Sequence, residues 1–151
     1  MTGKELLSSI FLFCSFCVMV WWYFKQGRYW FQKRTSRNWP SLGAVIQRGA
    51  VGPVSIGKGA LNGCFLGYAF QVNSTRYAGF FVIFCDEDKV AGQLQRDLPG
   101  TSVEIHYVPS DPNISYLADV YDPRFGWQGA NQNPDYLSQA PAFDLADAMR
   151  K

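Results

Sequence analysis

The chain is poor in the residues that most often build catalytic and metal sites. Its 151 residues include one histidine, His106, and four cysteines. No cluster of His and Cys has the spacing of a metal site. Cys14 and Cys17 have the Cys-x-x-Cys spacing of redox motifs, but they lie inside an apolar run and outside any βαβ pattern. These absences predict a protein that is not an enzyme and has no metal and no cofactor.

Two weaker catalytic patterns have simpler structural explanations. Glu104 and His106 share one face of a predicted strand, and a solvated strand face explains them more simply than an acid/base pair does. The segment Gly52–Gly59 nearly matches a phosphate-binding loop. However, Gly59 replaces the Ser or Thr that would hold magnesium, and no helix pattern follows. We therefore expect neither an active site nor a nucleotide site here.

An uncharged run of nineteen residues, Leu6–Phe24, is the most informative feature of the chain. As a helix it would be about 28 Å long, close to the thickness of the hydrocarbon core of a bilayer. The run passes into Lys25 without the small residues of a signal-peptide cleavage site. The sequence predicts a single transmembrane helix at 6–24, preceded by a short extension at 1–5.

Charge is distributed unevenly along the chain. Residues 1–48 contain seven Lys or Arg and one acidic residue, whereas residues 49–151 contain seven Lys or Arg and eleven acidic residues. Cationic segments beside membrane helices tend to stay in the cytoplasm. We therefore expect a single-pass membrane protein, with its N-terminus outside and its C-terminal domain in the cytoplasm.

Basic and aromatic residues interleave in and before the juxtamembrane segment 25–38. Nucleic-acid binding is one interpretation, but beside a membrane this pattern is more typical of contact with lipid headgroups. Aromatic rings also favour that level of the bilayer, because one side of the ring is apolar and the other polar. We expect membrane lipid as a partner, and no nucleic acid. The predicted membrane-interface residues are Trp21, Trp22, Tyr23, Lys25, Arg28, Tyr29, Trp30, Lys33 and Arg34.

Strand signals dominate residues 39–118, which we expect to form one β-rich domain. The predicted strands are Leu42–Gln47, Cys64–Val72, Arg76–Cys85 and Thr101–Val108. A short helix is predicted at Asp86–Leu98, because acidic residues begin it and Pro-Gly ends it. The Gly-rich segment Gly49–Gly63 is predicted to be a loop or a loose hairpin connection. The expected fold is mainly β, a small antiparallel sandwich or barrel-like domain with one short helix.

Two of these strands predict a central hairpin. If the turn centres between Ser74 and Thr75, the numbers of opposed residues sum to 149, so that Cys64 faces Cys85. Both faces of this hairpin are apolar, which predicts a cover on each side. A disulfide would imply an oxidising compartment, so we favour two buried thiols.

Three groups of residues resemble a known family. Trp39-Pro40 followed by Gly43–Ile46 is similar to the opening strand of the bacterial membrane-associated family called domain of unknown function 3592. Tyr68–Val72 with Tyr77–Gly79 resembles its central hairpin, and Pro99–Val103 with Tyr107–Pro112 and Ser115–Leu117 resembles its closing strand and turn. The resemblance covers about residues 36–118. It implies a small β-rich domain beside one or two membrane helices, with no catalytic residues to carry over.

The segment 119–151 follows as an arm rich in aromatic, Gly and Pro residues, with a short terminal helix. Large aromatic side chains are unusual in disordered segments, so we expect this arm to dock through them. Its candidate partner-binding residues are Tyr121, Phe125, Trp127 and Tyr136.

These features together predict a non-catalytic accessory or scaffold subunit. It would bind a larger membrane protein complex through its helix, its β domain and its aromatic arm. The alternative is a membrane-anchored β domain that senses a small ligand or a lipid, which requires an enclosed pocket lined by Phe and Tyr.

Overall fold

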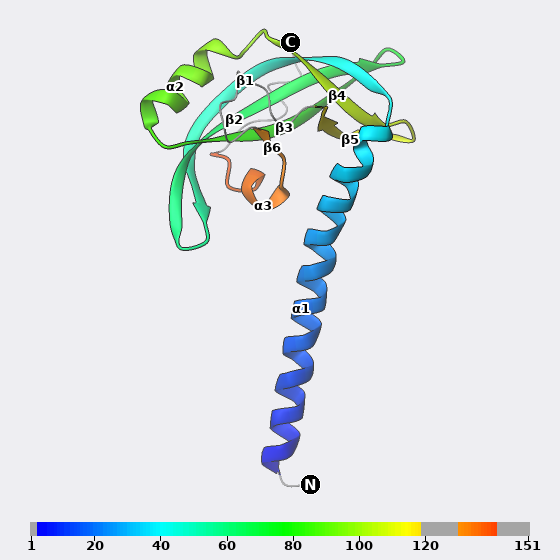
Figure 1. Ribbon diagram of the computed structural model, residues 1–151, viewed down its shortest axis with the longest axis vertical. Coiled ribbons are helices and arrows are strands. Elements are labelled where there is room, and N and C mark those ends of the chain that lie inside the picture. Colours follow the sequence, from blue (N-terminus) through cyan, green and yellow to red (C-terminus); the bar gives the residue numbers. More distant parts are fainter. Residues whose placement is uncertain (1–2, 119–129, 142–151) are drawn as a thin grey trace. The chain divides into compact units, whose positions relative to one another are not determined.

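The computed structural model describes residues 3–118 and 130–141, without the side chains of residues 3–9, 25 and 26. The chain forms two units, Met1–Thr35 and Ser36–Lys151. The first unit contains one long helix, α1 (Gly3–Thr35), which includes the predicted membrane helix. The second unit contains a single antiparallel sheet and several short helices (Figure 1).

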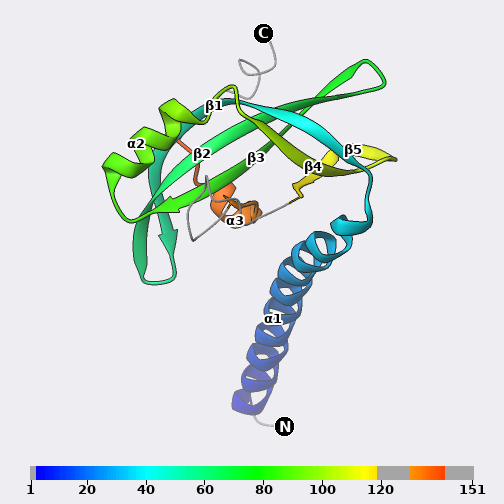
Figure 2. The same ribbon diagram turned by 45° about the horizontal axis from the view of Figure 1, so that its top comes forward.

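The sheet has six strands in the order β5-β4-β1-β2-β3-β6, and it curls into a nearly closed, barrel-like form. This confirms the predicted mainly-β, barrel-like fold. Figure 2 shows α2 over one end of β1, β2 and β3, where its contacts with these strands lie. The elements of this unit are η1 (Ser36–Asn38), β1 (Ser41–Ile56), β2 (Gly59–Val72), β3 (Thr75–Cys85), α2 (Asp88–Asp97), β4 (Ser102–Val108), β5 (Asp111–Leu117), β6 (Ala130–Asn131) and α3 (Pro134–Leu137).

Of the two predictions for Gly49–Gly63, the loop was wrong and the hairpin connection is correct, although the hairpin is tight and not loose. β1 continues to Ile56 and β2 begins at Gly59, so that only Gly57 and Lys58 connect them. Gly57 has a φ of 59°, the conformation that type II′ hairpin turns reserve for glycine at their first position. The Gly-rich composition therefore belongs to a long, tight hairpin.

Pro53 is compatible with this strand because of the side on which it lies. Alternate residues of a strand direct their backbone groups to the same side, so Pro53 shares the side of Gly49 and Ser55. The backbone groups of Gly49 and Ser55 bond to glutamine side chains outside the β1–β2 ladder. The backbone N–H that Pro53 lacks would therefore point away from β2. The β1–β2 ladder loses no hydrogen bond, and proline is tolerated at such a position.

The central hairpin forms as predicted, but its register differs by two residues. The turn consists of Asn73 and Ser74, whose φ angles are 49° and 67°, typical of a type I′ turn that matches the twist of the strands. Opposed residue numbers therefore sum to 147, as for Tyr68 and Gly79. Because the difference is even, every side chain keeps its predicted face.

The predicted opposition of Cys64 and Cys85 was wrong for the same reason. Cys64 pairs with Ile83 and Cys85 pairs with Asn62. Both cysteines are buried free thiols, as favoured from the sequence.

Both faces of the hairpin are covered by the chain itself. The inner face belongs to the main core, to which α2 contributes Ala91 and Leu94. The outer face forms a second cluster of Val54, Phe65 and Val82, against which residues of the C-terminal arm pack. The buried inner-face residues of the hairpin are Cys64, Leu66, Tyr68, Phe70, Phe81, Ile83 and Cys85. The sequence pattern thus correctly predicted a central hairpin with two covers.

Gly79 makes room for the largest fully buried side chain, Tyr68. A Cβ atom at Gly79 would lie 2.3 Å from Cζ of Tyr68, which is its direct cross-strand partner. We expect Gly79→Ala to lower the free energy of unfolding by about 1–3 kcal/mol, because the ring is buried and hydrogen-bonded and cannot move aside. Urea unfolding of the full chain in detergent micelles measures this change.

Gly43→Ala provides the matched control. Gly43 also lies in a strand, but a Cβ atom there meets nothing within 4 Å. Its effect should stay within about 0.5 kcal/mol. Equal destabilisation by both substitutions would mean that loss of glycine, and not contact with Tyr68, sets the cost.

Candidate functional site: an apolar helix and a barrel closed by glutamine

Helix α1 is apolar on all of its sides near its start. Ile10, Phe11, Leu12 and Phe13 are each exposed, at between 54% and 76% of their surface. Successive residues of an α-helix are about 100° apart, so four in a row surround the helix axis. These four residues form the first apolar belt, which leaves no side of the helix polar at this level.

A second apolar belt follows eleven residues later, about 16 Å along the axis. It consists of Trp21, Trp22, Tyr23 and Phe24, which are exposed at between 57% and 74% of their surface. A helix that lies on a membrane surface has one apolar face and one polar face. A helix that is apolar all round is instead typical of a membrane span. Among the described residues, this is the one helix long and apolar enough to cross a membrane.

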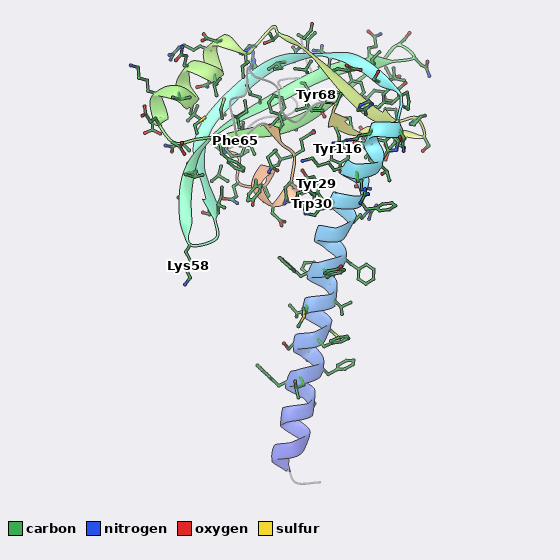
Figure 3. All side chains as sticks on the ribbon, in the orientation of Figure 1. Tyr29, Trp30, Lys58, Phe65, Tyr68 and Tyr116 are labelled. Carbon is green, nitrogen blue, oxygen red and sulfur yellow. The ribbon has the colours of Figure 1, made fainter. Side chains whose placement is uncertain are left out.

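The predicted membrane-interface residues all lie within α1. Figure 3 labels two of them, Tyr29 and Trp30. Arg28, Trp30 and Arg34 are exposed and Lys33 is half-buried. The rings of Tyr29 and Trp30 meet edge to face at 5.8 Å between centroids. The Lys33 ammonium lies 5.8 Å from the ring centroid of Tyr29 and 5.5 Å from that of Trp30. The backbone of Lys25 is helical, and its side chain lies outside the described atoms.

The barrel interior contains one polar cluster, formed by Tyr68, Ser115 and Gln132. The hydroxyl of Tyr68 lies 2.9 Å from Oγ of Ser115, across the space between β2 and β5. The side-chain amide of Gln132 donates to the same hydroxyl at 3.1 Å. Burial raises the pKa of Tyr68 to about 12, so the hydroxyl stays protonated at neutral pH. Its interactions hold the aromatic core in place, to which the ring of Tyr68, labelled in Figure 3, belongs.

Gln132 also connects β3 and β5, which are not hydrogen-bonded neighbours in the sheet. Its Oε1 accepts a hydrogen bond from the backbone N–H of Leu117 in β5, at 2.8 Å. Its Nε2 donates to the backbone carbonyl of Phe80 in β3, at 3.2 Å. A side-chain amide presents the same donor and acceptor as a peptide group. Gln132 therefore closes the barrel at this point in the way that a residue of a further strand would.

The rest of the arm, residues 133–141, covers the outer face of the hairpin. The Tyr136 ring meets the Phe84 ring edge to face at 5.2 Å, and Leu137 and Ala140 pack against the outer cluster. The Gln139 side chain accepts from the backbone N–H of Ser55 at 2.7 Å and donates to its carbonyl at 3.4 Å. Tyr136 thus docks on its own chain. The other candidate partner-binding residues, Tyr121, Phe125 and Trp127, lie outside the described residues.

The residues that were considered for catalysis or nucleotide binding lie in strands and in a hairpin turn of the fold. Nδ1 of His106 lies 3.0 Å from the carbonyl oxygen of Trp39, which can only accept, so this nitrogen donates. Glu104 is exposed on the same strand, and Gly57-Lys58 forms a hairpin turn followed by β2 instead of a helix. No group of three or more His, Cys, Asp or Glu that could hold a metal occurs among the residues searched in 3–118 and 130–141.

The two buried thiols are protonated at neutral pH. Burial raises the pKa of Cys64 to about 12, and it raises the pKa of Cys85 as well. Because the thiolate is the reactive form of cysteine, these two side chains behave as small apolar residues of the core.

Comparison with protein-family models, with curated proteins and with solved structures found no match to this chain. The resemblance to the domain of unknown function 3592 family stays a prediction.

The closure by Gln132 yields a stability prediction. Gln132→Ala leaves the Leu117 N–H and the Phe80 carbonyl without this partner, which should lower the free energy of unfolding by about 1–3 kcal/mol. The amide hydrogen of Leu117 should exchange faster with solvent in this variant. Hydrogen exchange followed by mass spectrometry on the full chain in micelles measures this.

The control is Gln93→Ala, which removes an exposed glutamine from α2. It should leave both the unfolding free energy and exchange at Leu117 unchanged. Unchanged exchange at Leu117 in the Gln132 variant would show that the barrel edge is held closed by other contacts.

Proposed function

We propose that this chain is a non-catalytic, membrane-anchored accessory subunit that binds a larger membrane protein complex. The observation that carries the proposal is the pair of apolar belts on α1. Such a surface requires an apolar environment on every side, which lipid or the helices of a membrane partner supply.

The distribution of exposed apolar side chains supports assigning the partner contact to α1. Outside α1, the exposed large hydrophobic residues of the described part of the chain are Val45 and Val90. The aromatic hairpin packs against the main core on one face and against the arm on the other. The described part of the β domain therefore offers little apolar area for a partner, and α1 offers much.

The packing of the barrel interior favours this function over ligand sensing. The ring centroids of Phe70 and Phe81 each lie 6.2 Å from that of Tyr68, and all three side chains are buried. Side chains of the chain thus occupy the place where the sensing function requires a pocket lined by aromatic residues. The roles of His106 and the buried thiols in holding the fold likewise favour a non-catalytic protein.

The proposal places the β domain in the cytoplasm of a bacterial cell and the N-terminus outside the inner membrane. Residues 25–37 carry five cations and no acidic residue, and such segments stay in the cytoplasm. A C-terminal fusion to alkaline phosphatase, which is active only outside the cytoplasm, should therefore be inactive. Strong phosphatase activity would reverse this orientation.

Copurification tests the accessory function itself. The full chain, extracted from its native membranes in a mild detergent, should appear in native mass spectrometry in a stoichiometric complex with a membrane protein. Replacing residues 6–24 with an unrelated apolar helix of nineteen residues should keep the chain in the membrane and remove the partner, because the specific side chains of the belts that contact it are replaced.

Two results of this experiment contradict parts of the proposal. A wild-type chain that is always monomeric contradicts the accessory function. A partner that stays bound to the helix-replacement variant assigns the contact to the β domain, with α1 as a tether only. Val45→Arg with Val90→Arg is the matched control, and it should keep the partner.

A further inference from the structure

We infer that α1 binds the headgroups of anionic phospholipids through a collar of three cations, Arg28, Lys33 and Arg34. This inference rests on the proposed membrane anchoring of α1. It specifies which lipids the anchor prefers and which side chains select them.

The three cations surround the helix. At about 100° per residue, Arg28 and Lys33 lie roughly 140° apart around the axis, Lys33 and Arg34 roughly 100°, and Arg34 and Arg28 roughly 120°. A helix that lies on the membrane surface collects its cations on one polar face. A helix that crosses the membrane meets headgroups on every side, which is the arrangement that this collar fits.

The collar also lies at the right distance from the second apolar belt. Arg28 is about 6 Å beyond Phe24 along the axis and Arg34 about 15 Å beyond it. The headgroup layer is about 5–7 Å thick on each side of the hydrocarbon core. With Phe24 at the edge of the hydrocarbon core, Arg28 lies at the level of the phosphates, whereas the Cα atoms of Lys33 and Arg34 lie about 7–10 Å beyond the headgroup layer.

The direction of the side chains brings the two outer cations back toward the headgroups. Side chains of an α-helix tilt toward its N-terminus, which here is the side of the apolar belts. Lys33 shows this tilt, because its ammonium lies over the rings of Tyr29 and Trp30, four and three residues earlier. Flexible stems of Lys and Arg in this orientation place their charges closer to the membrane than their Cα atoms.

The charge of this segment selects anionic over zwitterionic lipid. No acidic residue occurs between Leu6 and Arg37, so this part of the sequence adds no negative charge next to the collar. Each Lys or Arg near an anionic surface contributes about 1 kcal/mol of binding, which a zwitterionic surface does not supply. Phosphatidylglycerol and similar lipids with a net negative headgroup are therefore the ligands that the collar fits.

Lipid titration of the full chain tests this inference. The chain in neutral detergent micelles is titrated with phosphatidylglycerol or with phosphatidylcholine of the same acyl chains, and bound lipid is counted by native mass spectrometry. The collar variant, Arg28→Gln with Lys33→Gln and Arg34→Gln, should bind phosphatidylglycerol about 100-fold more weakly than the wild type, from three contributions of that size. Phosphatidylcholine binding should be equal in the two proteins.

The matched control removes the same charge from the other unit of the chain. Lys58, Lys89 and Arg96 are exposed cations of the β domain, and their joint replacement by Gln changes the net charge equally. This control should bind phosphatidylglycerol within about threefold of the wild type, a difference of less than 1 kcal/mol. Added salt should weaken phosphatidylglycerol binding by the wild type, and much less by the collar variant.

Each contrary outcome overturns a distinct statement. Equal phosphatidylglycerol affinity of wild type and collar variant overturns the collar, as does an equal loss in the control. Tighter binding of the wild type to a short single-stranded RNA than to phosphatidylglycerol would assign the collar to nucleic acid. Failure of the wild type to float with phosphatidylcholine vesicles after carbonate washing would overturn the membrane anchor itself, and with it the premise of this inference.

Discussion

The β domain depends on how its sheet satisfies the backbone groups at its edges. A strand edge presents a row of N–H and C=O groups, which attract other chains when they stay unpaired and cost free energy when they are buried. Five longer strands and the two-residue β6 curl far enough to bring β3 and β5 near each other, but they do not complete the ring. The amide of Gln132 completes it at Phe80 and Leu117, and Gln95 and Gln139 satisfy exposed groups of β1.

This manner of closure makes the C-terminal arm part of the fold. Residues that close the barrel and residues that cover its outer face follow one another within 130–141, so that pairing at β3 and packing on Phe84 support each other. The two covers of the aromatic hairpin then both come from the same chain. The two apolar faces of the hairpin, which could have bound a partner, are therefore buried within the domain. Helix α1 is the element that still exposes a large apolar surface among the described residues.

The sequence predicted those features that follow from a repeating pattern. Alternation with a period of two identified β4 and both faces of the hairpin, and acidic residues at the start with Pro-Gly at the end identified α2. The predicted register was wrong by two residues because the register depends on the position of the turn. The alternation of side chains between the two faces does not distinguish a turn at Asn73-Ser74 from a turn one residue later. Likewise, glycine and proline in Gly49–Gly63 indicated a loop, whereas the open side of β1 accommodates Pro53. Gln132 carried no local signal, since Phe80 is 52 residues away in sequence.

The two units of the chain differ in where their apolar side chains lie: α1 exposes them and the β domain packs them inside. The β domain buries or half-buries its described aromatic residues, and among the described residues beyond α1 the large exposed hydrophobic side chains are Val45 and Val90. Helix α1 buries none of the residues of its two belts. A soluble environment would penalise these belts by roughly 25 cal/mol for each Å² of apolar surface left in water, a cost that no packing within the belts themselves offsets. The same helix becomes favourable in a bilayer, because its backbone groups are satisfied internally and its surface is apolar in every direction. The contrast explains why we expect the contacts of this protein with its surroundings on α1 and its cationic end, and not on the described surface of the barrel.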